Sequence, residues 1–292
     1  MEIEKARELG LCFGVRRAIK LLKEAASKYG NIETLGPVAH NQQLLQALTK
    51  VGIKPIDNLE QVQGKILAVT THGVSPQVLS QIAARHIKLV DTTCPIVLQA
   101  QNTAKELADS GFDVIIFGEA EHPEVKGLLG WVGNKGIAAL EVKQLLAANK
   151  ATPYRLGIIS QTTQSQSAFV EFIIQLIAAL PSVIAREAKQ SLKEIRIINT
   201  LCQVTQRCQE EAIRLAQKNQ LMIVIGGHDS ANTKRLAEAC SPIVETHLVE
   251  GASEVNRSWL AGKHHIGIVA GTSTPDEAIE EVVAKLKALQ GV

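Results

Sequence analysis

The sequence predicts an α/β protein made of three similar βα-repeat domains, because one pattern occurs three times along its 292 residues. In each copy a short stretch that begins with isoleucine, at 3–7, 87–91 or 195–199, leads to one cysteine, a helical segment follows, and a polar turn comes 28 residues after the cysteine; the cysteines are Cys12, Cys94 and Cys202. Aromatic residues are only 3% of the chain, and aliphatic residues dominate. This composition favours Val/Ile-rich parallel strands covered by helices. Three equivalent cysteines predict thiolates that converge near a pseudo-threefold axis around a central metal centre.

A chain of this length suits two or three domains better than one core. We expect the first repeat to span residues 12–93, the second 94–200 and the third 201–292, with residues 1–11 adding a strand to the third repeat.

The first repeat begins with an amphipathic segment and contains two strand–turn units. Its expected elements are a helix from Arg16 to the stop at Gly30, a strand at 32–35, a helix at 42–50, a strand at 65–69 and a helix opened by Ser75 and Pro76.

The second and third repeats follow the same order. In the second we expect a helix from Cys94-Pro95 to Gly111, a strand at 113–117 with a polar turn at 119–124, and a strand at 155–159. In the third we expect a helix from Cys202 to about Lys218, strands at 221–225 and 265–269, and a last helix opened by Pro275, with Thr274 and Glu277 fitting a capping box.

Charge and hydropathy exclude several function classes. The 31 basic and 29 acidic residues give a net charge of +2 without a block of one sign, which argues against nucleic-acid or membrane-surface partners. The most apolar stretch, 169–180, is too short to span a bilayer. The charged N-terminus does not resemble a signal peptide. Five spaced cysteines without secretory context indicate a reducing, cytoplasmic location.

The three repeated cysteines are the candidate metal ligands. Any one of them alone would more often be a small buried apolar residue, but three at equivalent positions favour metal ligation. Thiolates suit zinc or an iron–sulfur cluster. No CxxC pair of the kind common in structural zinc sites occurs, so a cluster held at three corners with one open iron fits better. Cys208 and Cys240 have no counterparts in the other repeats and are expected to be core residues.

The polar turns at predicted strand ends are a candidate anion site. His40, His72 and His122 occupy such turns, whereas the other five histidines are expected on the surface or in loops. Together with Ser230, Asn232 and Ser273, these histidines could donate hydrogen bonds to a polyanion such as a diphosphate. Helix capping is the simpler role for the serine and asparagine side chains, and it does not exclude ligand contact.

Glu124 and Thr162 are the candidate catalytic residues. Glu124 stands two residues after His122, at a predicted helix start, where a carboxylate is favourable for electrostatic reasons alone. Among histidines and a metal centre it becomes the best candidate proton donor. Thr162 could pass a proton or cap a helix.

These segments together resemble the 4-hydroxy-3-methylbut-2-enyl diphosphate reductase (LytB/IspH) family. The matching motifs run in the family's order over nearly the whole chain; they are residues 10–18, 38–41, 71–75, 91–95, 122–125, 160–163, 230–236 and 270–276. Jointly they are far more specific than any one of them.

The resemblance implies a three-domain α/β trefoil around one [4Fe–4S] cluster per chain, bound by Cys12, Cys94 and Cys202 with one iron open. It implies that His40, His72, His122, Thr162, Ser230, Asn232 and Ser273 contact the substrate and that Glu124 supplies a proton. The implied reaction is the last step of the non-mevalonate (MEP) isoprenoid pathway. It is a two-electron reductive dehydroxylation of (E)-4-hydroxy-3-methylbut-2-enyl diphosphate to isopentenyl and dimethylallyl diphosphate. Ferredoxin or flavodoxin is the implied electron donor.

The chain departs from the family's pattern at two positions, and two other functions are open to a protein with these residues. Ala231 stands where relatives often have a second serine, and Cys208 stands where an arginine is common. The first alternative is a cluster-dependent hydro-lyase or isomerase without net redox change. The second is a non-catalytic protein whose metal only ties the domains together, which gives no reason for a pocket lined by histidine and serine.

Overall fold

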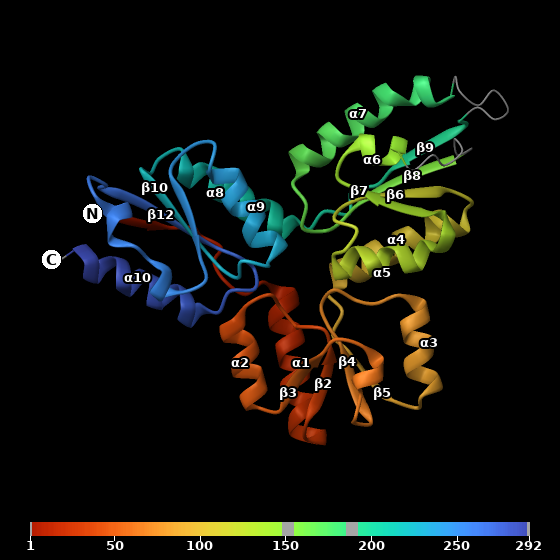
Figure 1. Ribbon diagram of the computed structural model, residues 1–292, viewed down its shortest axis with the longest axis horizontal. Helices are drawn as coiled ribbons and strands as arrows, with labels where there is room; N and C mark the ends of the chain where they lie inside the picture. The colour runs from red at the N-terminus through yellow and green to blue at the C-terminus, as the bar shows by residue number, and fades with distance from the viewer. Residues whose placement is uncertain (1, 148–154, 185–191, 291–292) are drawn as a thin grey trace. The chain divides into compact units, whose positions relative to one another are not determined.

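A computed structural model describes residues 2–147, 155–184 and 192–290 (Figure 1). The chain divides into two compact units, Met1–Thr71 with Gln203–Val292, and His72–Cys202. In the described residues the strands are β1 Glu2–Lys5, β2 Ile32–Leu35, β3 Ile53–Ile56, β4 Ile66–Val69, β5 Lys88–Asp91, β6 Asp113–Phe117, β7 Gly136–Ala139, β8 Arg155–Ser160, β9 Glu194–Ile197, β10 Leu221–Ile225, β11 Thr246–Val249 and β12 His265–Ala270. The α-helices are α1 Phe13–Tyr29, α2 Gln42–Lys50, α3 Pro76–Ala84, α4 Pro95–Asp109, α5 Pro123–Val132, α6 Val142–Ala147, α7 Gln166–Ile184, α8 Gln203–Ala216, α9 Ala231–Cys240 and α10 Asp276–Gln290.

The strands form three four-stranded sheets. We call them the terminal sheet, with order β1-β12-β10-β11, the first-repeat sheet, with order β3-β2-β4-β5, and the middle sheet, with order β7-β6-β8-β9. Neighbouring strands are parallel throughout the terminal and middle sheets, and β2 is parallel to both β3 and β4. The predicted α/β class with parallel sheets is therefore confirmed.

Helices cover both faces of the terminal and middle sheets, so each central strand buries both of its faces. In β10, Leu221, Ile223 and Ile225 pack with residues of α10, whereas Met222 and Val224 pack with residues of α8 and α9. Figure 1 shows α10 on one side of this sheet and α8 and α9 on the other. Side chains of a strand alternate between faces, and all five residues of β10 are fully buried. This is why the central strands read as continuous apolar runs.

The central pair of each sheet coincides with the strands expected from the sequence, whereas β3, β5, β7, β9 and β11 were not expected. All five lie at sheet edges. One departure concerns the last helix, which begins at Asp276 rather than at Pro275. The Thr274 hydroxyl donates to the carbonyl of Ile225 at 3.0 Å, and its capping box with Glu277 stays a prediction.

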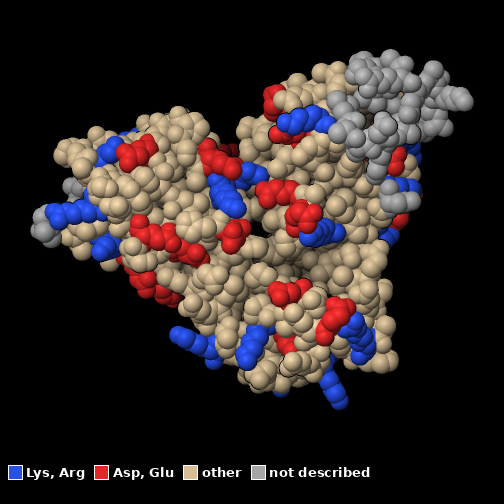
Figure 2. All heavy atoms as spheres, in the orientation of Figure 1, with Lys and Arg blue, Asp and Glu red and all other residues tan. Residues whose placement is uncertain are grey.

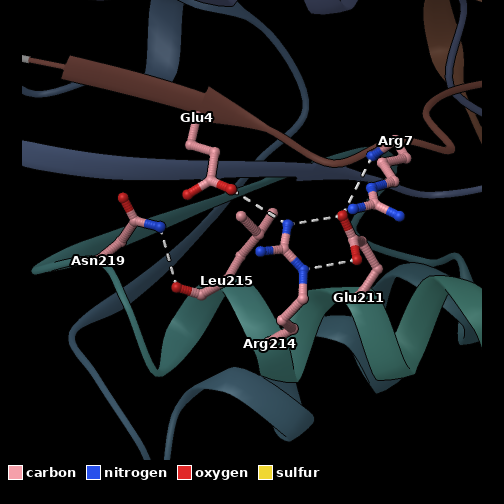
Figure 3. Close-up of polar contacts among 6 residues, drawn as sticks. All are labelled: Glu4, Arg7, Glu211, Arg214, Leu215 and Asn219. Atoms are coloured by element: carbon pink, nitrogen blue, oxygen red, sulfur yellow. Dashed lines mark hydrogen bonds and ion pairs between the residues drawn. The ribbon is translucent and has the colours of Figure 1, made fainter.

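The edge strand β1 is tied to helix α8 by a charged network (Figure 3). The Arg214 guanidinium makes two 2.8 Å hydrogen bonds to the carboxylate of Glu211 and one of 3.1 Å to Glu4 in β1. These charge-assisted bonds hold the pKa of Glu211 below its usual value. The network thus fastens β1, the strand that precedes Cys12 in the chain, to helix α8.

The surface carries both signs of charge, interspersed over the face shown in Figure 2. Within the described residues, no helix combines the length and the apolar character needed to cross a membrane.

A close backbone approach joins the turn after β10 to the turn after β2. A Cβ atom on Gly227 would lie 1.9 Å from the carbonyl oxygen of His40, so only glycine fits there without displacement. Gly251, in the turn after β11, is a useful contrast. A Cβ there would approach no atom more closely than the end of the Gln43 side chain, at 3.4 Å.

We predict that Gly227→Ala lowers the free energy of unfolding by about 1–3 kcal/mol, because the methyl group must push the His40 backbone away. Gly251→Ala is the matched control and is expected to change it by less than about 0.5 kcal/mol, or to raise it. Thermal and denaturant unfolding of both variants measure the difference. Equal stability of the two variants would contradict the packing constraint.

Candidate functional site

The predicted site residues lie where strands end and helices begin. Cys12 and Cys94 are the N-cap residues of α1 and α4, and Cys202 directly precedes α8. Each cysteine follows an edge strand, β1, β5 or β9. The histidine, serine and threonine turns follow central strands of the same sheets. Because these strands are parallel, their carboxyl ends deliver the turns to one edge of each sheet, where α/β proteins bind ligands.

Two of the cysteines are anchored by the same kind of hydrogen bond. The amide of Cys12 donates to the carbonyl of Thr272 at 3.0 Å, and the amide of Cys202 donates to the carbonyl of Thr162 at 2.8 Å. Thr272 follows β12, the neighbour of β1, and Thr162 follows β8, the neighbour of β9. In both repeats the cysteine is thus fixed to the polar turn of the adjacent central strand.

The thiols fall into two groups that fit different roles. Cys12, Cys94 and Cys202 are partly exposed, whereas Cys208 and Cys240 are buried. Cys208 and Cys240 pack in one hydrophobic cluster, as expected, and burial raises the pKa of the Cys240 thiol to about 11. A metal ligand has to be a thiolate. Three partly exposed thiols at strand-to-helix junctions therefore form a donor set that suits an iron–sulfur cluster.

Glu124 is held by Thr162 on both of its carboxyl oxygens. The Thr162 amide donates to Oε1 at 2.6 Å, and the Thr162 hydroxyl lies 2.9 Å from Oε2. Glu124 is 1% exposed and Thr162 is 4% exposed. Since the carbonyl of Thr162 also accepts from Cys202, one threonine connects the buried carboxyl group to a predicted metal ligand.

Burial raises the pKa of Glu124 to about 7, even though the two hydrogen bonds from Thr162 act to lower it. A carboxyl group with a pKa near neutrality can hold a proton at physiological pH and release it to a neighbour. The acidity of the predicted proton donor therefore suits that task.

His122 caps helix α5 and stands directly before this carboxyl group. Its Nδ1 accepts a hydrogen bond from the Glu124 amide at 3.2 Å, which places the proton of a neutral ring on Nε2. The ring of His72 meets the ring of His122 edge to face, with centroids 5.4 Å apart. The second unit thus brings His72, His122, Glu124, Thr162 and Cys202 into one connected set.

The first unit contains buried polar groups without a protein partner. Ser230 caps α9 by accepting from the Thr233 amide at 3.3 Å. Asn232 and Ser273 are 4% and 7% exposed, and among the described residues neither side chain has a hydrogen-bond partner. A buried polar group left unpaired costs about 1–3 kcal/mol, so these groups are suited to a polar ligand.

His40 lies beside these turns in the same unit. It borders a pocket of about 190 Å³ together with Asn41, Gly227 and Asp229. Burial lowers the pKa of His40, which the nearby Asp229 carboxylate partly offsets by raising it. Cys12 belongs to this unit as well.

Two supporting residues were not identified from the sequence. Asn41 caps α2 through Oδ1, which accepts from the Leu44 amide at 2.9 Å, and its buried Nδ2 has no partner among the described residues. Gln161 is fully buried, and its amide group bonds to Glu119, Thr163 and Gln164, which fixes the turn that holds Thr162. Both stand next to predicted site residues inside the quoted motifs, and that adjacency was the available signal.

Comparisons with known proteins agree on one family. The family model described as LytB protein matches residues 3–287. A protein of Dehalococcoides mccartyi, named 4-hydroxy-3-methylbut-2-enyl diphosphate reductase, is 42% identical over 289 residues, with 99% of each chain covered.

Solved structures give the same answer for the fold. The structure of (E)-4-hydroxy-3-methyl-but-2-enyl diphosphate reductase, described as the terminal enzyme of the non-mevalonate pathway, is 32% identical; the match covers 99% of this chain and 100% of that one, with a TM-score of 0.69. The Plasmodium falciparum E-1-hydroxy-2-methyl-but-2-enyl-4-diphosphate reductase is 24% identical; the match covers 98% of this chain and 87% of that one, with a TM-score of 0.88, and it supports the fold alone. The family match over almost the whole length and the identity to the bacterial relative lead to one conclusion: this chain belongs to the LytB protein family.

Proposed function

We propose that the protein is a 4-hydroxy-3-methylbut-2-enyl diphosphate reductase of the non-mevalonate pathway, which removes the allylic hydroxyl as water with two electrons and two protons. The observation that carries the proposal is the buried Glu124 carboxyl group. It is bonded to Thr162, whose backbone is in turn bonded to Cys202. This arrangement puts a proton donor beside a predicted metal ligand, as a reductive dehydroxylation requires.

In this proposal Cys12, Cys94 and Cys202 hold one [4Fe–4S] cluster through three thiolates. When bound, the cluster would supply electrons and an open iron that acts as a Lewis acid on the substrate oxygen. The chain's contribution is to fix the cysteines at strand-to-helix junctions through their backbone amides, as for Cys12 and Cys202.

Glu124 and Thr162 would deliver the proton. A carboxyl group protonated on Oε2 donates to the Thr162 hydroxyl oxygen 2.9 Å away, and that hydroxyl then directs its own proton outward to the substrate oxygen. Burial keeps Glu124 protonated up to a pH of about 7. Both side chains are almost fully buried, and the low dielectric of such surroundings strengthens the hydrogen bond between them.

The diphosphate would be bound by His40, His72, His122, Ser230, Asn232 and Ser273. The unpaired side chains of Asn232 and Ser273 support this role, because a diphosphate oxygen accepts hydrogen bonds that no described protein group provides. The hydrogen bond from the Glu124 amide to Nδ1 puts the proton of a neutral His122 ring on Nε2. Ala231 removes one hydroxyl that relatives often provide, and the backbone amide remains as a donor.

A one-electron carrier such as ferredoxin or flavodoxin is the expected electron source.

Anaerobically purified wild-type protein is expected to be brown and to contain iron and sulfide, and Cys202→Ser is expected to lose most of that iron. Cys208→Ser, on the adjoining helix, is the matched control and should retain it, because Cys208 lies in the hydrophobic core. Iron and sulfide analysis with visible spectra measures both. A colourless wild-type protein holding stoichiometric zinc after anaerobic reconstitution would favour the metal-tied structural protein instead.

Glu124→Gln is expected to lower kcat for the reduction by about 10²–10⁴-fold, since an amide cannot donate the carboxyl proton. The assay follows substrate consumption with dithionite-reduced methyl viologen, and cluster content is measured in parallel. Glu121→Gln, an exposed carboxylate of the same turn, is the matched control and should keep full activity. Substrate turnover by the wild type without oxidation of the viologen would instead identify a hydro-lyase or isomerase.

The pH dependence follows from the acidity of Glu124. The donor must be protonated, so kcat/KM should be level below pH about 7 and fall above it as the carboxyl group ionises. Rates measured from pH 5.5 to 9 test this, with Glu121→Gln expected to keep the same alkaline limb. A rate that rises through pH 7 would argue that Glu124 acts as a base rather than as an acid.

A further inference from the structure

Helix α1 concentrates positive charge in a chain that is otherwise slightly acidic. It contains five basic residues and one acidic residue, Glu24; the basic residues are Arg16, Arg17, Lys20, Lys23 and Lys28. The helix therefore has a net charge of +4. Because the whole chain has +2, all other residues together sum to −2. The net positive charge of the chain is thus accounted for by this one helix.

The exposed face of α1 forms a stripe, which we define as Phe13, Arg16, Lys20 and Lys23. These residues recur every three or four positions, so they lie along one side of the helix. Phe13 is 65% exposed, and the side chains of Arg16 and Lys20 are 53% and 76% exposed. The opposite side is buried through Val15, Ala18, Leu22 and Ala25. That burial fixes which side of the helix faces solvent.

The counter-ions of the stripe are weakly held. Arg16 lies 3.5 Å from Asp276, and Lys20 lies 3.9 Å from Glu24. Ion pairs this exposed are weak, because water and salt screen them, and they exchange readily with other partners. The lysine side chains can therefore turn to an incoming acidic surface at little cost, whereas the Arg16 Nε also donates to the carbonyl of Leu11 at 2.7 Å.

The stripe begins directly after Cys12, which is proposed to hold the cluster. Cys12 is the N-cap of α1, and Phe13 is the first residue of the helix. An exposed phenylalanine is an unfavourable surface residue unless it is covered, and aromatic side chains are frequent anchors in protein interfaces. The basic stripe thus leads, along one helix, to an exposed aromatic residue that follows Cys12 in the chain.

We propose that the α1 stripe is the docking surface for a small acidic one-electron carrier protein. The proposal rests on the proposed function, since a reduction that consumes two electrons needs two visits from such a carrier. Each visit oxidises one carrier by one electron, and the two electrons with two protons release the substrate hydroxyl as water. A carrier that must arrive and leave twice per turnover needs fast, salt-sensitive association rather than a tight interface. Complementary charge provides that association.

The test compares two donors and two charge-reversal variants of the holoenzyme. Lys20→Glu with Lys23→Glu is expected to lower kcat/KM for a reduced plant-type [2Fe–2S] ferredoxin by about tenfold or more at low ionic strength. The difference should shrink in ~0.5 M salt, where screening is strong. With dithionite-reduced methyl viologen the same variant should keep kcat within about twofold of wild type, because the lysines do not contact the substrate.

Lys285→Glu with Lys287→Glu, on the exposed face of α10, is the matched control because it changes the net charge by the same amount. This variant should keep the wild-type kcat/KM for ferredoxin. An equal fall in both variants, or no fall in either, would overturn the docking surface. Wild-type turnover with viologen but not with ferredoxin would also overturn it. A wild type that consumes substrate with neither donor would instead overturn the reductase function, so the two failures are distinguishable.

Discussion

The backbone hydrogen bond from a cysteine amide to the neighbouring threonine turn is the contact on which the candidate site depends. It recurs in two sheets, Cys12 to Thr272 and Cys202 to Thr162, with nearly equal lengths. A parallel sheet makes this possible, because the edge strand and the central strand end side by side. The thiol is thereby positioned by the backbone of rigid strands and not by a flexible loop. A metal-binding residue placed in this way varies little in position.

Thr162 extends this constraint to Glu124, the proposed proton donor. Its carbonyl is engaged by Cys202, while its amide and hydroxyl group engage Glu124. The two bonds to Glu124 favour the carboxylate, and burial favours the neutral acid more strongly, so the pKa of Glu124 reaches about 7. The opposing effects keep the group near neutrality, where it both holds and gives up a proton. Gln161 stabilises this geometry, because its side chain accepts from the Glu119 amide in the turn after β6 and donates to the Thr163 hydroxyl in its own turn.

The first unit contains features that reduce stability and that the fold itself does not need. Asn232 and Ser273 keep buried polar atoms without a described partner, and Gly227 lets the His40 backbone approach to a distance that no side chain would allow. Each feature reduces stability or restricts the sequence, and neither is needed to build the sheets. Local departures of this kind are expected where a ligand completes the hydrogen bonding.

By itself the sequence determined the α/β class and the central strands of all three sheets. Five of these strands, β4, β6, β8, β10 and β12, are mainly apolar and largely buried, whereas β2, Ile-Glu-Thr-Leu, alternates buried and half-buried residues. The sequence also singled out the three cysteines, Glu124 and the polar turns, since one pattern repeats at equal spacing. Edge strands such as β3, with Lys54 and Pro55, and β9, with Glu194 and Arg196, carry no such signal, because one side of each is left to solvent. Only the tertiary structure could reveal the acidity of Glu124, the anchoring of the cysteine amides and the unpaired amide of Asn232. Burial and hydrogen bonding arise from residues far apart in the chain, and no local pattern encodes them.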